Sequence, residues 1–150
     1  NLNPQSRGNV HIVSRDHRDA PSIDPNYLSA EQDKIVAAQS IKLARRIISQ
    51  PAMKKYNPHE FAPGIQFQSE EDLKKVAGDI GTTIFHPVGT CAMGKSISFV
   101  TDSNLKVRGV EGLRVADASI MPTITSGNTN APTLMIAEKA SEMILNSNKI

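Results

Sequence analysis

Aromatic residues and cysteine are scarce in this chain of 150 residues. It contains four Phe, two Tyr and no Trp, and large aromatic side chains normally supply much of the buried surface of a core. The single cysteine, Cys91, excludes an internal disulfide framework. No apolar run approaches the roughly 18 residues that span a bilayer, so we expect no membrane partner.

An excess of one charge is also missing. Seventeen Lys and Arg stand against fifteen Asp and Glu, and the two signs are interspersed. Nucleic acids and anionic membranes attract clustered positive charge, so we expect no nucleic acid partner. The length suits one compact domain. Because the core would have few aromatics and the chain has no initiator Met, we expect a piece of a larger protein.

Helical periodicity predicts three helices. The first runs over 30–49 after a capping box, Ser29-Ala30-Glu31-Gln32, and Pro51 stops it. Residues 51–68 are predicted as loop, and a second helix opens at Ser69 with acidic residues in its first turn. The expected apolar face of the first helix consists of Val36, Ala37, Ser40, Ile41, Ala44, Ile47 and Ile48.

The third predicted helix covers 132–146, with Pro132 in its first turn and Asn130 or Ala131 as cap. It is apolar around most of its circumference, so we expect it to be buried in a larger protein. Extended segments are predicted at 9–14, at 83–85 and, as a pair joined by a tight turn, at 105–107 and 113–117. The predicted fold class is α+β.

His86 is the main candidate for chemistry. It follows the β-forming residues Thr83, Ile84 and Phe85 and precedes Pro87, which biases it to an extended backbone. We expect a stiffly held ring at a strand end, suited to a general base, although a lone histidine there is more often a core residue. The spacing of His59, His86 and Cys91 does not fit a structural zinc site, so no metal is expected.

A polar segment precedes the third helix. Residues 123–130 are almost all small or polar, and the amides of Asn128 and Asn130 can both donate and accept hydrogen bonds. The helix start behind them favours negative charge. This pattern fits a site for a polar ligand group and fits a well-capped structural helix equally.

Three blocks in this order resemble the carboxy-terminal region of glucose–methanol–choline (GMC) flavin oxidoreductases. They are HPVGTCAMG at 86–94, GVEGLRVADASIMP at 109–122 and GNTNAPTLMIAEKA at 127–140. The resemblance implies FAD-dependent oxidation of a small-molecule alcohol, with His86 as the base and Asn128 bound to the substrate oxygen. It also implies that 1–90 belong to an antiparallel-sheet substrate-binding (cap) domain and 91–150 to the carboxy-terminal strand and helix of an FAD-binding α/β domain.

The same resemblance assigns the cofactor-binding residues. Asp117 and Ala118 match the stretch beside the ribityl and pyrophosphate groups, while Thr129, Asn130 and Pro132 match the part near the flavin ring. The family binds the ADP half of FAD at a Gly-x-Gly-x-x-Gly turn, and the sequence contains no such motif. The expected partner is therefore an FAD-binding amino-terminal remainder, without which the chain should be inactive.

Two other functions stay open from the sequence. One keeps the fold and flavin but uses His86 for acid–base cleavage, as in a hydroxynitrile lyase of this family. The other is a non-enzymatic module that packs on a partner chain. The pattern at 130–132 is closer to the oxidoreductases than to the lyases, so alcohol oxidation is the leading hypothesis.

Overall fold

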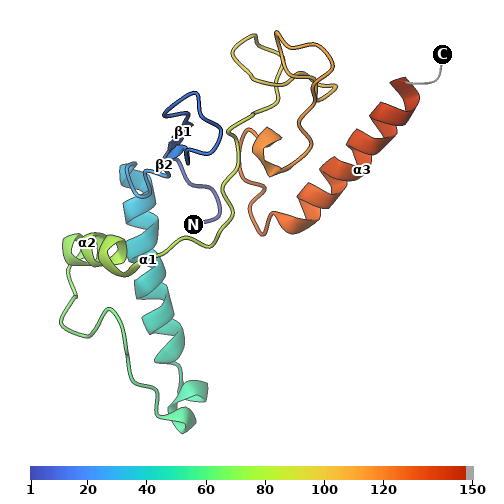
Figure 1. The fold of residues 1–150 in the computed structure, drawn as a ribbon. Helices are drawn as coiled ribbons and strands as arrows, with labels where there is room; N and C mark the ends of the chain where they lie inside the picture. Colours follow the sequence, from blue (N-terminus) through green and yellow to red (C-terminus); the bar gives the residue numbers. More distant parts are fainter. Residues whose placement is uncertain (148–150) are drawn as a thin grey trace. The chain divides into compact units, whose positions relative to one another are not determined.

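The computed structural model describes residues 1–147 and shows helices joined by long irregular segments, with one small sheet (Figure 1). The helices are α1 (Glu31–Ile48), α2 (Glu70–Ile80) and α3 (Asn130–Ser147), with 3₁₀ turns at Pro51–Tyr56 and Ala118–Ile120. Strands β1 (Asn9–His11) and β2 (Ser22–Asp24) form a two-stranded antiparallel sheet. This content agrees with the α+β prediction at the level of fold class. No helix within 1–147 is both long and apolar enough to cross a bilayer.

The chain divides into two compact units. The first comprises Asn1, Asn3–Gly8 and Ile23–Thr83, and the second comprises Leu2, Asn9–Ser22 and the described residues from 84 onward. This division reflects compactness alone. The assignment of 1–90 to a cap domain and 91–150 to an FAD-binding domain therefore stays a prediction.

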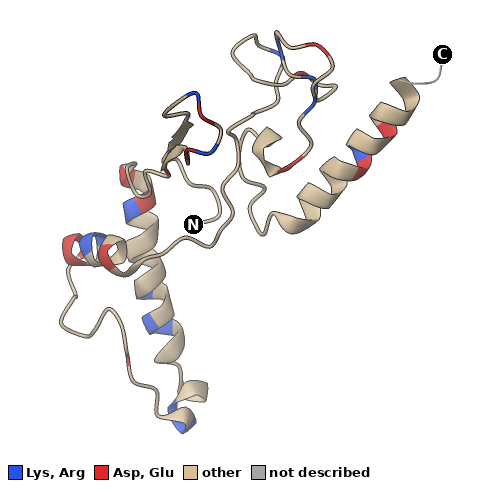
Figure 2. Cartoon of the chain, viewed as in Figure 1, with Lys and Arg blue, Asp and Glu red and all other residues tan. Residues whose placement is uncertain are grey.

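The first unit is organised by the packing of α1 on α2. Ala38 and Leu73 are fully buried between the helices, and Phe67 packs against them from the loop. Charged residues of both signs lie along α1 and α2 (Figure 2). Lys74 Nζ lies 2.8 Å from a carboxylate oxygen of Glu31 on the other helix. Apolar contact and this exposed ion pair together join the helices, and the pair contributes only modestly.

The predicted start of α2 is confirmed, whereas the predicted capping box of α1 is wrong. The Ser69 hydroxyl accepts a hydrogen bond from the Asp72 amide, as expected of an N-cap. The N-cap of α1 is Ala30, without a side-chain cap. The Ala30 amide instead donates to the hydroxyl of Ser6 at 3.1 Å. A residue distant in sequence thus satisfies the amide of the N-cap residue, while α1 has no side-chain cap.

The apolar face of α1 is buried over only part of its length. Of the predicted face, Ile41 packs against the buried cluster of Ala38, Leu73 and Val76, whereas Ile47 and Ile48 are 54% and 42% exposed. Ala38, which has no exposed surface, was not among the residues predicted for this face. The helix ends at Ile48, and Pro51 then begins a 3₁₀ turn where loop was predicted, since its fixed φ suits a first helical position.

The second unit has its core where α3 meets the segment before it. The buried members are Leu105, Ile120, Met121, Ile136 and Ala140. On the remaining surface of α3, Leu134 and Leu145 are 64% and 67% exposed. Only one face of α3 is thus covered within the described chain, and its full burial in a larger protein stays a prediction.

The strands predicted in the second unit are wrong in extent. At 105–107 and 113–117 there are only isolated bridges, one of them between Lys106 and Arg114, although the Val107 amide does donate to the Leu113 carbonyl. The predicted strand at 83–85 is not formed, and Phe85 has a left-handed φ of +61°. That conformation turns the chain out of an extended path, and Phe85 is 80% exposed.

Candidate active site

The second unit brings His86 and Thr129 together across 43 residues of sequence. The Nδ1 atom of His86 lies 3.1 Å from the hydroxyl oxygen of Thr129. His86 is partly buried and Thr129 is 8% exposed. His86 is therefore not at a strand end as predicted, but its ring is still held, because a hydrogen bond fixes the Nδ1 edge.

Thr129 is placed by the first turn of α3. Its carbonyl oxygen accepts hydrogen bonds from the Thr133 amide at 3.0 Å and from the Thr133 hydroxyl at 2.7 Å. Thr129 is also β-branched, so its χ1 rotation is restricted. The position of its hydroxyl thus follows from the start of the helix.

The segment after His86 runs beside the 3₁₀ turn Ala118–Ile120. The amides of Cys91 and Met93 donate to the carbonyls of Ser119 and Ile120, at 3.0 and 2.8 Å. Gly89 has a φ of +94°, and a Cβ there would lie 3.3 Å from the Met121 carbonyl oxygen, so glycine suits this position for two reasons. The first two sequence blocks are therefore neighbours in space.

Asp117 and Ala118 lie within the second block, where the chain enters the 3₁₀ turn Ala118–Ile120. One carboxylate oxygen of Asp117 accepts from the Ser119 amide at 2.8 Å and from the Ser119 hydroxyl at 2.5 Å. Ala118 opens the 3₁₀ turn. The structure gives Asp117 a capping role, and the predicted contact of both residues with a cofactor stays a prediction.

The remaining candidates cluster at the start of α3. Asn128 is exposed and directly precedes the buried Thr129. Asn130 is the first residue of α3, and Pro132 lies in its first turn as predicted. The first amides of a helix lack intrahelical acceptors and carry partial positive charge. The third block therefore presents two amide side chains and a helix start close to the residue that contacts His86.

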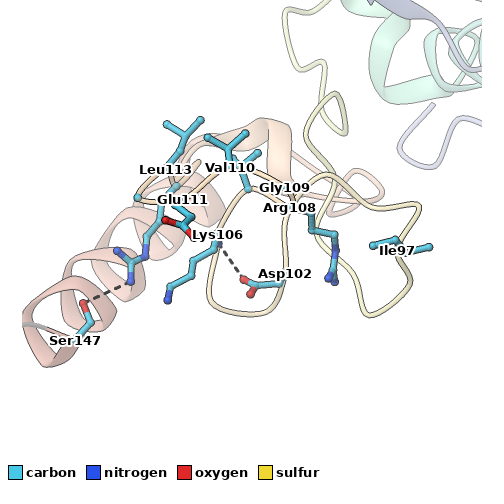
Figure 3. Close-up of a pocket in the computed structure, with 12 residues that line it drawn as sticks. Ile97, Asp102, Lys106, Arg108, Gly109, Val110, Glu111, Leu113 and Ser147 are labelled. Atoms are coloured by element: carbon cyan, nitrogen blue, oxygen red, sulfur yellow. Dashed lines mark hydrogen bonds between the residues drawn. The ribbon is translucent and has the colours of Figure 1, made fainter.

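A hollow among the described residues lies elsewhere in this unit. It measures about 710 Å³ and is lined by residues 106–114 with Ile97, Asp102 and Ser147 (Figure 3). A hydrogen bond from the Lys106 amide, reinforced by one from Asn104 and by nearby cations, holds the pKa of Asp102 below its ordinary value despite some desolvation. None of the predicted site residues lines this hollow. Within residues 1–147, no three His, Cys, Asp or Glu side chains are placed to hold a metal ion.

Sequence reasoning placed His86 and Thr129 in one site but missed the contact between them. It assigned Thr129 to the cofactor, and neither periodicity nor spacing links residue 129 to residue 86. It also gave no role to Asp33, which is 2% exposed and accepts hydrogen bonds from four donor groups of the first six residues. A carboxylate in the first turn of a predicted helix was the available signal for Asp33.

Comparison with known proteins gives consistent matches along nearly the whole chain. A family model described as GMC oxidoreductase matches residues 4–137. An oxygen-dependent choline dehydrogenase of Citrobacter koseri is 50% identical over 93% of this chain and 25% of its own length. An alcohol dehydrogenase [acceptor] of Pseudomonas putida is 46% identical over 96% of this chain and 26% of its own length.

A solved structure agrees with these sequence matches. The FAD-dependent oxidoreductase of Chaetomium thermophilum superposes with a TM-score of 0.92 and 34% identity, covering 99% of this chain and 26% of that one. The chain thus spans about a quarter of the length of the curated relatives it matches. With a family model covering most of its residues, the chain belongs to the GMC oxidoreductase family.

Proposed function

We propose that this chain is the carboxy-terminal part of an FAD-dependent enzyme that oxidises a primary or secondary alcohol to a carbonyl compound. The names of the relatives, choline dehydrogenase and alcohol dehydrogenase, support the reaction class. The observation that carries the proposal for this chain is the partly buried imidazole of His86, fixed at Nδ1 beside the start of α3.

The residues present fit the proposed cofactor. Asn128 and Asn130 offer donors and acceptors, and the positive end of α3 suits a ring system that gains negative charge on reduction. Asp117, Ala118, Thr129, Asn130 and Pro132 are the proposed contacts. When bound, FAD supplies the acceptor for the hydride that leaves the carbinol carbon.

His86 has the task of removing the hydroxyl proton. An alkoxide releases hydride far more readily than an alcohol, so loss of the O–H proton to a neutral imidazole makes the C–H bond easier to break. The imidazolium then lies beside the developing charge, where attraction is strong once water is excluded. Asn128, always neutral, orients the substrate oxygen but cannot accept its proton.

Rapid mixing of the full-length enzyme with an alcohol, followed by flavin bleaching, tests these roles. His86→Ala should slow flavin reduction by roughly 10²–10⁴-fold, the usual contribution of a positioned acid–base group. Asn128→Ala should slow flavin reduction less than His86→Ala does, should retain FAD, and should keep the pH dependence of the reduction rate. Near wild-type reduction in His86→Ala, together with an inactive Asn128→Ala, would contradict the assignment.

A further inference from the structure

We propose that Thr129 is a positioning residue for His86: its hydroxyl binds Nδ1 and so leaves Nε2 as the nitrogen that exchanges a proton with the substrate. The inference rests on the proposed function, because it needs His86 to act as the base. It adds a second role for Thr129, orientation of the imidazole through its side-chain hydroxyl, to the proposed contact with the cofactor. The 3.1 Å distance between the hydroxyl oxygen and Nδ1 carries it.

The chemistry of imidazole fixes the direction of this hydrogen bond during catalysis. A neutral histidine has one nitrogen that donates and one that accepts. If Nε2 is to accept the substrate proton, Nδ1 must carry the ring hydrogen and donate it to the Thr129 hydroxyl oxygen. When Nε2 becomes protonated, the same Nδ1–H bond persists, so the ring need not turn.

The surroundings of Thr129 make it suitable for this task. Its side chain is 8% exposed, and its carbonyl is held by both the amide and the hydroxyl of Thr133. A buried, β-branched side chain at the start of a helix has little freedom to move. The start of α3 therefore sets the orientation of the imidazole, because it places Thr129 beside His86 although the two residues are far apart in sequence.

Three variants of the full-length holoenzyme separate orientation from folding. Thr129→Val keeps the shape and removes the hydroxyl, and Thr129→Ser restores a hydroxyl. Ser141→Ala is the control, because it removes a hydroxyl of the same helix that donates to the Ala137 carbonyl, far along α3 from Thr129. Two readouts are needed: the ¹⁵N signals of the His86 ring, identified by their loss in His86→Ala, and the rate of flavin reduction at saturating alcohol.

The wild type and Ser141→Ala should show His86 with hydrogen on Nδ1, and Thr129→Val should show a mixture of tautomers. Flavin reduction in Thr129→Val should fall about two- to tenfold, the value of one ordinary hydrogen bond, with KM little changed and recovery in Thr129→Ser. Unchanged ring signals in Thr129→Val, or an equal change in Ser141→Ala, would overturn the inference. Full activity of His86→Ala would instead overturn the proposed function, whatever the ring signals show.

Discussion

The side chain of Asp33 holds the amino-terminal segment to the first turn of α1. Its carboxylate accepts hydrogen bonds from the Gln5 amide at 2.9 Å, from the Ser6 amide and hydroxyl at 2.7 and 2.5 Å, and from the Asn1 side chain at 2.8 Å. Burial raises the pKa of Asp33, but these hydrogen bonds outweigh it and hold the pKa below its ordinary value. The folded state therefore favours the ionised carboxylate.

Asp33→Asn should loosen residues 1–8. The side-chain NH₂ group of asparagine would replace one carboxylate oxygen, and it cannot accept the hydrogen bonds that this oxygen now accepts. Hydrogen bonds to a charged group contribute about 1.5–3 kcal/mol, so amide exchange of this segment should speed up by roughly tenfold or more. Hydrogen exchange with mass spectrometry on the full-length protein measures this. Asp24→Asn, at an exposed carboxylate that accepts from the Asn26 amide, is the control and should change little.

The same carboxylate gives a pH dependence with a definite sign. Because the folded pKa of Asp33 is lowered, its contribution is fully present above the unfolded value, near 3.9, and is lost as the pH falls through the folded pKa. Protection of residues 1–8 should thus drop at acid pH in the wild type and be nearly independent of pH in Asp33→Asn. If protection fell equally at acid pH in both proteins, the loss would have to come from titratable groups other than Asp33.

At the scale of elements, α2 depends on its N-cap. Ser69→Ala removes the acceptor of the Asp72 amide and should destabilise the helix by about 1 kcal/mol. Ser40→Ala is the control within α1, where the hydroxyl only donates to the Val36 carbonyl and its removal should be near neutral. The hydrogen-exchange rates of the α2 amides are compared between the two variants. Equal rates would contradict a stabilising role of the Ser69 cap.

The helices were predictable from sequence because their signals are local. Ser69 and the acids after it fixed the start of α2, and α1 was predicted at 30–49 against an observed Glu31–Ile48. A strand needs a partner strand, and the local sequence pattern does not show whether one is present. The strand predicted before His86 does not form, and Phe85 there has a left-handed φ. The hydrogen bond from the Ala30 amide to Ser6 was missed for a similar reason, since Ser6 is distant in sequence.

At the scale of the whole molecule, we expect the isolated chain to purify colourless and to bind FAD poorly. It lacks the glycine-rich turn that holds the ADP half, and Phe61, Phe85 and Ile97 are each at least 80% exposed. A visible spectrum after incubation with FAD and desalting tests this, with the full-length protein as the control. A yellow preparation with stoichiometric flavin would contradict the expectation.

The candidate site was predictable only in part at this scale. The resemblance of three blocks supplied His86, Asn128 and Thr129 as site residues, because motif order is legible in sequence. The contact between His86 and Thr129 was not predictable, since they are 43 positions apart and the segment between them folds as bridges and turns without periodicity. Which residues touch the cofactor and substrate stays a prediction.

Arg45 gives the loop between α1 and α2 an unusual dependence on one guanidinium group. Its nitrogens donate to both carboxylate oxygens of Glu60, at 3.0 and 2.7 Å, and to the carbonyls of Gly64 and Phe67, at 3.0 and 2.8 Å. A lysine would keep the charge but cannot reach these four acceptors in a planar fork. Among diverging relatives, residue 45 should therefore change together with the length and sequence of this loop. Even a lysine at position 45, usually regarded as a conservative replacement, should occur only where the loop also differs.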